Sequence, residues 1–149
     1  MNKKSLKCVG LNCRNMHDEI RNIVFFDGVC GVCNSLVDWM LKLDKKGKLY
    51  FCSLQSEKAL SLLGEERVKN LDTLYFIANG NLYERSTAAL HILTKLGFFY
   101  SFLAKMLFIV PIFLRDGIYN WVSRNRYSWF GKREECRIPS KEELERFVV

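Results

Sequence analysis

The fold of this chain is decided by the stretch NIVFFDGVCGVCN at residues 22–34. Its first part, Ile23 to Phe26, is a short apolar run rich in β-branched and aromatic residues, and it stops at the turn dipeptide Asp27-Gly28. From Cys33 onward, apolar residues recur at helical spacing, as Leu36, Val37, Met40, Leu41 and Leu43. The stretch therefore predicts a buried strand that turns into a helix, with a Cys-x-x-Cys pair at the junction.

This pair, Cys30 and Cys33, is the candidate reactive site. At a helix N-terminus, unpaired backbone N–H groups and the positive end of the helix dipole favour a thiolate on Cys30. We expect Cys30 to be the exposed nucleophile of disulfide exchange. Cys33, one turn further and more buried, is expected to resolve the mixed disulfide.

Asp27, just before the pair, has two interpretations. A carboxylate near Cys30 opposes a thiolate there, yet it can accept or relay the proton of Cys33. Because Asp followed by Gly is common in turns, Asp27 can equally be a turn or capping residue. We treat Asp27 as a candidate catalytic residue together with Cys30 and Cys33.

The rest of the chain alternates predicted strands and helices. The first helix stops at Lys45-Lys46-Gly47, and further strands are expected over residues 49–52, over 74–78 and from 81, after the hairpin signal Asn79-Gly80. A short helix is expected over 56–63. Ser86 and Thr87 are expected to cap a helix with an inner face of Ala89, Leu90, Leu93 and Leu96. This order predicts an α/β fold with a four-stranded mixed sheet flanked by helices and additional C-terminal helices.

The most apolar segment, residues 98–114, raises the question of membrane contact. Lys105 lies at its middle, Pro111 interrupts it, and it is shorter than the roughly 20 residues of a membrane span. We predict two helices, over about residues 100–108 and 112–125, that form a buried hairpin; contact with a membrane interface is the alternative. In the tail that follows, aromatic and basic residues alternate. We expect these aromatics to pack onto the domain and the cations to be solvated, with no nucleic-acid partner.

The composition indicates one folded domain. The chain has 149 residues, of which 49% are hydrophobic, and its formal charge of +7 is within the range of ordinary soluble domains. Residues 1–21 show neither sustained periodicity nor the apolar core of a secretory signal. We therefore expect a flexible extension over 1–21, a domain over 22–149 and a cytoplasmic location.

Six cysteines in an intracellular chain indicate redox chemistry or metal binding. The alternative to a redox pair is a zinc site in which Cys8 and Cys13 join Cys30 and Cys33 as thiolate ligands. Against zinc, Cys33 leads directly from a buried strand into an amphipathic helix. We expect no metal and no cofactor, and we expect Cys52, within a predicted strand, to be a buried and unreactive thiol.

The stretch from Phe26 to Asn34 resembles the signature of the DCC family of thiol-disulfide oxidoreductases, named for its Asp and two Cys. The resemblance covers about residues 22–148 and continues through LDKKGKL at 43–49, SLQS at 53–56, and a tail with NRY at 125–127 and WFGK at 129–132. It implies a thioredoxin-like fold and disulfide exchange with a protein or a low-molecular-weight thiol. Cys136 ends this tail. We expect it to be a packing residue, with a third redox cysteine as the alternative.

One position departs from the wider thioredoxin-like pattern. These proteins usually carry a cis-proline before the third strand, facing the cysteine pair, whereas this chain has Asp72-Thr73-Leu74 there and prolines only at 111 and 139. Partner docking is therefore expected to differ from the usual thioredoxin mode. A binding module for a partner or a membrane surface, with idle cysteines, is the alternative to a redox enzyme.

Overall fold

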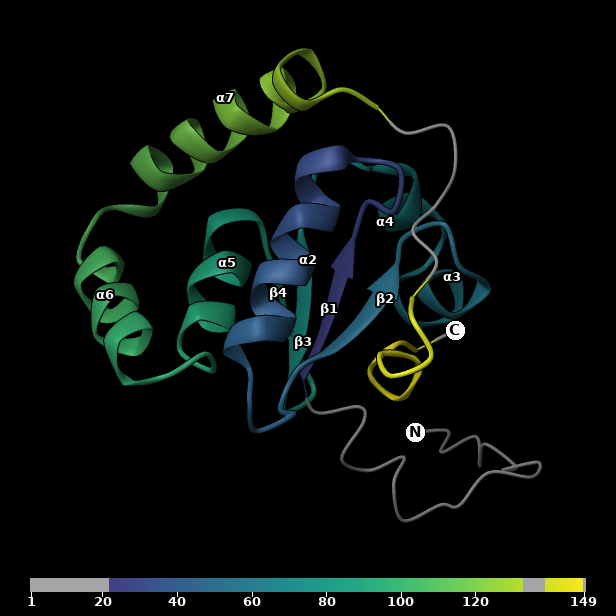
Figure 1. Cartoon of the computed structure of the whole chain (residues 1–149). Coiled ribbons are helices and arrows are strands. Elements are labelled where there is room, and N and C mark those ends of the chain that lie inside the picture. Colours follow the sequence, from purple (N-terminus) through teal and green to yellow (C-terminus); the bar gives the residue numbers. More distant parts are fainter. Residues whose placement is uncertain (1–21, 133–138, 149) are drawn as a thin grey trace, which may run out of the picture.

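The computed structural model describes residues 22–132 and 139–148, and it contains a four-stranded sheet flanked by helices (Figure 1). The strands, in the spatial order β2-β1-β3-β4, are β1 (Asn22–Phe26), β2 (Tyr50–Ser53), β3 (Tyr75–Ala78) and β4 (Asn81–Glu84). β1 is parallel to β2 and antiparallel to β3, and β3 is antiparallel to β4. The predicted mixed α/β sheet of thioredoxin-like arrangement is confirmed.

Six α-helices and one short 3₁₀ helix accompany the sheet in the described residues. They are α2 (Gly31–Leu43), α3 (Glu57–Leu63), α4 (Glu65–Lys69), α5 (Arg85–Leu93), α6 (Phe98–Phe108), α7 (Ile112–Phe130) and η1 (Leu144–Arg146). Sequence reasoning missed α4, which is only five residues long and has no buried residue. At the hairpin between β3 and β4, Asn79 and Gly80 both have positive φ, 51° and 79°, as the Asn-Gly signal predicts.

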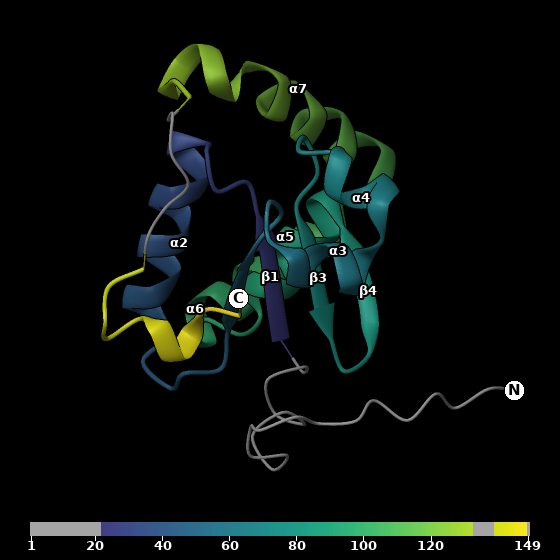
Figure 2. The ribbon, with the colours of Figure 1, turned by 90° about the vertical axis from the view of Figure 1, so that its right-hand side faces the viewer.

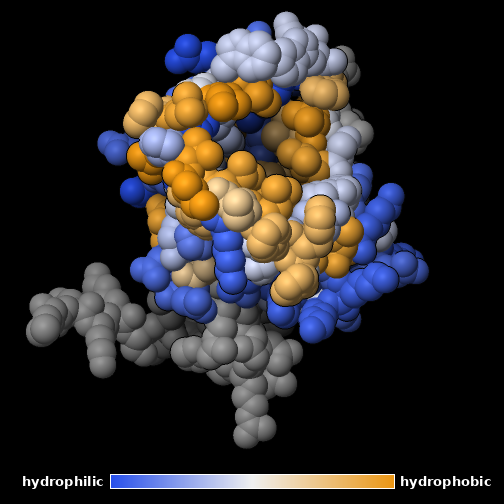
Figure 3. Space-filling view, turned by 90° about the vertical axis from the view of Figure 1, so that its left-hand side faces the viewer, coloured by the Kyte–Doolittle hydropathy of each residue, from blue (hydrophilic) through white to orange (hydrophobic). Residues whose placement is uncertain are grey.

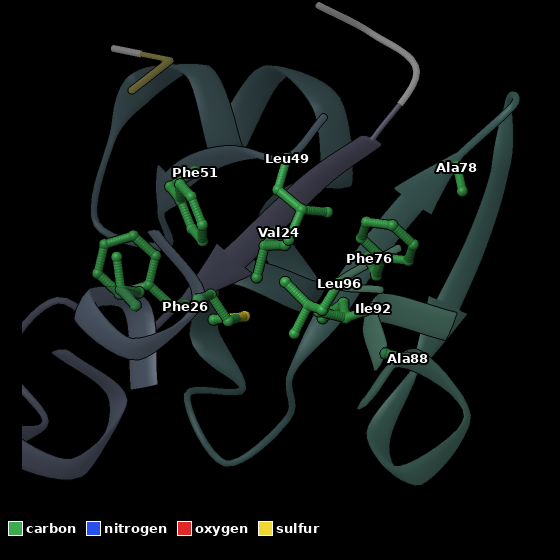
Figure 4. Close-up of a cluster of buried hydrophobic side chains, with 11 residues drawn as sticks. Val24, Phe26, Leu49, Phe51, Phe76, Ala78, Ala88, Ile92 and Leu96 are labelled. Carbon is green, nitrogen blue, oxygen red and sulfur yellow. The ribbon is translucent and has the colours of Figure 1, made fainter. Parts of the chain in front are cut away.

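Successive side chains of each strand point to opposite faces of the sheet, and each face has its own hydrophobic core. Val24 and Phe26 of β1 face α2 and α5, in a core that Figure 4 shows with Phe51 and Phe76 from β2 and β3. Ile23 and Phe25 of the same strand face α3. Figure 2 shows α2 and α3 on opposite sides of β1. Each fully buried apolar side chain of this kind contributes about 1.5–3 kcal/mol of transfer free energy, so both faces stabilise the strand that ends at Asp27.

Helix α5 differs from the sequence prediction at its start and in its inner face. Ser86 does not cap the helix; it lies within α5, and its hydroxyl donates a hydrogen bond to Asp116 of α7. Of the predicted inner face, Leu90 and Leu96 are buried and Leu93 packs against the core, whereas Ala89 is only half-buried and lines a cavity. Ala88 and Ile92, which lie outside the predicted inner face, are buried in the core. The physical reason is α7, which packs against α5 and takes up the Ser86 hydroxyl that would otherwise be free to cap.

The predicted buried hairpin of C-terminal helices is wrong. α6 and α7 follow each other across a bend of 115°, and only Ala104 of α6 is buried. Phe98 and Phe113 are 90% and 77% exposed. Within the described residues, no single helix has the length and apolar character of a membrane span. Taken together across their bend, α6 and α7 meet both criteria. In Figure 1, α7 arches over one end of the sheet toward the start of α2.

Candidate functional site

Cys30 and Cys33 lie where β1 turns into α2, as predicted. Cys30 is the N-cap residue of α2, and its Sγ accepts a hydrogen bond from the backbone N–H of Cys33 at 3.4 Å. The side-chain amide of Asn34 holds the preceding loop by donating to the carbonyls of Gly28 and Cys30 at 2.8 and 2.9 Å. Both thiols are free. The start of the helix therefore directs the backbone N–H of Cys33 at the sulfur of Cys30, which stabilises negative charge on that atom.

The exposure of the two thiols is the reverse of the sequence expectation. Cys30 is completely buried, whereas Cys33 is partly exposed. Backbone at the end of α7 and just after it lies against this turn and contributes to the cover over Cys30. Lys132 forms an isolated β-bridge with Cys30, and a Cβ on Gly31 would lie only 2.8 Å from the carbonyl oxygen of Phe130. This cover comes from about a hundred residues further along the chain, so the local sequence around the pair carries no sign of it.

Asp27 is the centre of a buried polar network. Its Oδ1 accepts hydrogen bonds from the backbone N–H of Val29 at 3.1 Å and the side-chain amide of Gln55 at 2.8 Å. Its Oδ2 accepts from the guanidinium of Arg126 at 3.2 Å and from the hydroxyl of Tyr127. The bond to Val29 is that of a turn residue. The others join the end of β1 to the segment after β2 and to α7, so Asp27 is also a buried anchor for α7.

Arg126 is the site residue that sequence reasoning missed. Instead of being solvated, it is 6% exposed, pairs with Asp27, and donates to the carbonyl of Leu71 at 2.6 Å. Its Nη1 lies 3.9 Å from Sγ of Cys33. The expected packing of the aromatics is also wrong for Trp121 and Trp129, which are 60% and 50% exposed. The signal that could have identified Arg126 is its place in the NRY segment of the family-like tail.

The Cys33 thiol holds its proton strongly. Burial raises the pKa of Cys33 well above its usual range, and its hydrogen bond to Cys30 and the charge of Cys30 raise it further. The positive charge of Arg126 partly offsets this rise. Burial also raises the pKa of Tyr119 to about 12, and burial together with the hydrogen bond to Asp27 raises that of Tyr127 to about 12. Burial and the neighbouring sulfur of Cys30 therefore favour the protonated form of Cys33.

These raised pKa values predict how the stability of the reduced protein depends on pH. In the unfolded chain, thiols ionise near pH 8.5 and tyrosines near pH 10, roughly. Because the folded state keeps Cys33 protonated above these values, its contribution is complete below about pH 8.5 and is lost as pH rises. Each such group should lower the free energy of unfolding by about 1.4 kcal/mol per pH unit above its unfolded pKa.

Urea unfolding in the presence of a reductant, at pH values from about 7 to about 10, measures how the free energy of unfolding changes with pH. The Cys33→Ser variant should lose the part of the decline above about pH 8.5 that comes from Cys33 and keep the part that comes from Cys52, whose pKa is also raised. Identical slopes for the wild type and Cys33→Ser would show that Cys33 is not a strongly protonated thiol in the folded state.

Cys33 opens into an apolar cavity of about 270 Å³ bounded by α2, α5 and α7. Its polar lining groups are few, namely Asp27, Cys33, Thr73, Tyr119, Ser123 and Arg126. The molecular surface in Figure 3 shows a hollow on the face formed by these helices, rimmed by hydrophobic residues. A thiol at the wall of an apolar cavity suits a substrate whose reacting sulfur sits next to apolar groups.

The segment before β3 borders this cavity, at the position where the sequence lacks a proline. The backbone of this segment is hydrogen-bonded to side chains of α7. The N–H of Leu74 donates to the hydroxyl of Tyr119 at 2.8 Å, and the hydroxyl of Ser123 donates to the carbonyl of Asp72 at 2.6 Å. Main-chain pairing with a partner at this segment would require α7 to move.

The remaining cysteines are only partly described by the structure. Cys52 is completely buried, its Sγ lies 3.2 Å from Oγ of Ser56, and burial raises its pKa, as expected of an unreactive thiol. Across residues 22–132 and 139–148, no cluster of three or more His, Cys, Asp or Glu side chains is placed to hold a metal. The proposed zinc ligands Cys8 and Cys13, and Cys136 with its redox alternative, lie outside the described residues.

Sequence comparisons with known proteins cover the residues of the candidate site and most of the chain. The sequence model of a family described as DCC1-like thiol-disulfide oxidoreductase matches residues 24–132. The chain is 40% identical to YuxK of Bacillus subtilis (strain 168), described as an uncharacterized protein, over 85% of this chain and 93% of YuxK. It is 32% identical to a chloroplastic DCC family protein of Arabidopsis thaliana, over 81% of this chain and 72% of that protein. No solved structure gives a significant match.

Proposed function

The chain belongs to the DCC1-like thiol-disulfide oxidoreductase family, and on that premise we propose that it exchanges disulfides with a protein or low-molecular-weight thiol through Cys30 and Cys33. The observation that carries the proposal is the sulfur of Cys30 at the N-cap of α2, accepting the N–H of Cys33. Such a position favours the thiolate, which is the attacking species in disulfide exchange. A cytoplasmic location, where thiols are kept reduced, suits reaction in the reducing direction.

In that direction, the Cys30 thiolate attacks one sulfur of a partner disulfide. A bond forms between Cys30 and that sulfur, the partner S–S bond breaks, and the other partner sulfur leaves as a thiolate that takes up a proton. Cys33 then loses its proton and attacks the sulfur of Cys30, so the second partner thiol is released. The two Cys residues end as a disulfide, and their two electrons have reduced the partner. Access to Cys30 requires the backbone at residues 130–132 to move aside.

Asp27 and Arg126 contribute in different ways to the second step of the exchange, in which Cys33 attacks the sulfur of Cys30. The guanidinium of Arg126 lies 3.9 Å from Sγ of Cys33 and lowers the pKa of that thiol, so it stabilises the thiolate that must form there. Asp27 raises the pKa of Cys33 through its charge, and it holds Arg126 in place through their ion pair. Asp27 is therefore a positioning residue for Arg126 as well as the candidate for handling the proton of Cys33.

The two cysteines should behave differently toward oxidised glutathione. Cys33→Ser should form a stable glutathione adduct at Cys30, because the resolving thiol is absent, whereas Cys30→Ser should form almost none. The wild type should show the adduct only transiently and end with a Cys30–Cys33 bridge. Intact-mass measurement and peptide mapping under non-reducing conditions would follow these species, and Cys52→Ser, at a buried thiol, should match the wild type.

The same variants separate this proposal from its alternatives. In cells, Cys33→Ser should accumulate mixed disulfides with partner proteins, and Cys30→Ser should not. Equal trapping by both variants would contradict the assigned roles. Purified protein carrying one zinc per chain, with no adduct on any variant, would favour the metal-binding module instead.

A further inference from the structure

The outer sides of α6 and α7 form one continuous apolar surface. Of the 21 exposed large apolar side chains in the described residues, 16 lie between residues 98 and 130, so this is a patch and not scattered exposure. We call it the α6–α7 face; among its most exposed members are Phe98, Phe99, Ile109, Phe113 and Trp121. Figure 3 shows hydrophobic residues gathered on this side of the molecule, around a hollow.

The charges that accompany the α6–α7 face are of one sign. Lys105, Arg124 and Lys132 are exposed on or beside it. The single acidic residue between positions 98 and 132 is Asp116, and it accepts a hydrogen bond from Ser86 of α5. Exposed cations around an apolar surface complement a layer of anionic lipid headgroups.

We propose that the α6–α7 face docks on the surface of an anionic lipid bilayer, with both helices lying in the interface. The bend of 115° and the charges along the helices suit helices that lie on a membrane, not a span that crosses it. Trp121 and Trp129, whose rings meet edge to face at 5.2 Å, supply the amphipathic aromatics that favour the headgroup region. This inference goes beyond disulfide exchange and does not depend on it.

A second copy of the chain fits the α6–α7 face less well than an anionic lipid bilayer does. A symmetric dimer through the α6–α7 face would bring two surfaces that both carry the exposed cations Lys105, Arg124 and Lys132 against each other, and like charges oppose such contact. An anionic membrane instead neutralises them. Docking would also place the cavity beside the lipid, since Val122 is 43% exposed on the α6–α7 face and lines that cavity.

Vesicle flotation with the full chain tests this proposal. The protein should bind vesicles of phosphatidylcholine mixed with phosphatidylglycerol more tightly than pure phosphatidylcholine, and added salt should weaken this binding. Phe113→Glu, at a side chain 77% exposed, should lower the partition coefficient by about tenfold or more. Lys105→Glu should lower it at least about fivefold on anionic vesicles only. Leu60→Glu, 46% exposed on α3 across the sheet, is the matched control and should leave binding unchanged.

Tryptophan fluorescence gives an independent measurement. With Trp39→Phe as background, emission from Trp121 and Trp129 should shift to the blue on anionic vesicles and be quenched by brominated lipid. No vesicle binding by folded protein at low salt would overturn the proposal, as would equal losses for Leu60→Glu and Phe113→Glu. A dimer in sedimentation that Phe113→Glu dissociates, with no vesicle binding, would assign the face to a second copy. The glutathione experiment is unaffected by any of these outcomes.

Discussion

Replacing Arg126 with methionine is expected to lower the free energy of unfolding by about 3–5 kcal/mol, because it leaves Asp27 buried and charged without its cation. Asp27 and Arg126 are 2% and 6% exposed, so water cannot replace the lost partner without rearrangement. Urea unfolding of the reduced protein would measure the change. Arg124→Met, at an exposed position two residues earlier in α7, is the control and should stay within about 0.5 kcal/mol of the wild type.

A second variant distinguishes an unpaired charge from simple loss of packing. Asp27→Asn combined with Arg126→Met removes both charges, and it should be more stable than Arg126→Met alone. If the single Arg126→Met change costs no more than Arg124→Met, the ion pair contributes nothing and α7 is held by its other contacts. If the double variant is as unstable as the single one, the cost comes from packing of the guanidinium and not from charge.

Gly31→Ala is expected to raise the alkylation rate of Cys30 by about tenfold or more and to destabilise the protein by about 1–3 kcal/mol. The new Cβ would lie 2.8 Å from the carbonyl oxygen of Phe130, a backbone atom that cannot rotate away, so the cover over Cys30 must shift. Timed alkylation of the reduced protein, followed by peptide mapping, would report the rate at Cys30 separately from those at Cys33 and Cys52.

Gly117→Ala is the matched control for this change. Gly117 lies within α7, and a Cβ added there meets nothing within 4 Å. Alanine should therefore raise the free energy of unfolding by up to about 1 kcal/mol through helix propensity and leave the Cys30 rate unchanged. An unaltered Cys30 rate in Gly31→Ala, with the expected loss of stability, would show that the cover can shift without exposing the sulfur.

The parts of the fold that depend on neighbouring residues could be predicted from the sequence. The strand before Asp27, the helix after Cys30 and the Asn79-Gly80 hairpin follow from local periodicity and turn chemistry, and all three are confirmed. Cys30 at the N-cap of α2 follows from the same local pattern. These features need no information about the rest of the chain.

The cover over Cys30 and the role of Arg126 could not be predicted in this way. Both arise because α7 returns to the start of α2, and their partners are about a hundred residues away. An arginine within a run of basic and aromatic residues has the pattern of a solvated cation. Likewise, the apolar pattern of residues 98–114 predicts that these side chains avoid water, but not whether protein or lipid covers them.

The position of Arg126 has a thermodynamic consequence for α7. This one residue belongs to α7, pairs with Asp27 and lies beside the sulfur of Cys33, which can ionise as a thiol but not as a disulfide. The free energy that holds α7 in place therefore differs between the dithiol and the disulfide. By reciprocity, any ligand of α7 that favours one of these forms shifts the reduction potential of the pair, by about 30 mV for each 1.4 kcal/mol of coupling. The reduction potential measured at the cysteines would then report what is bound to α7.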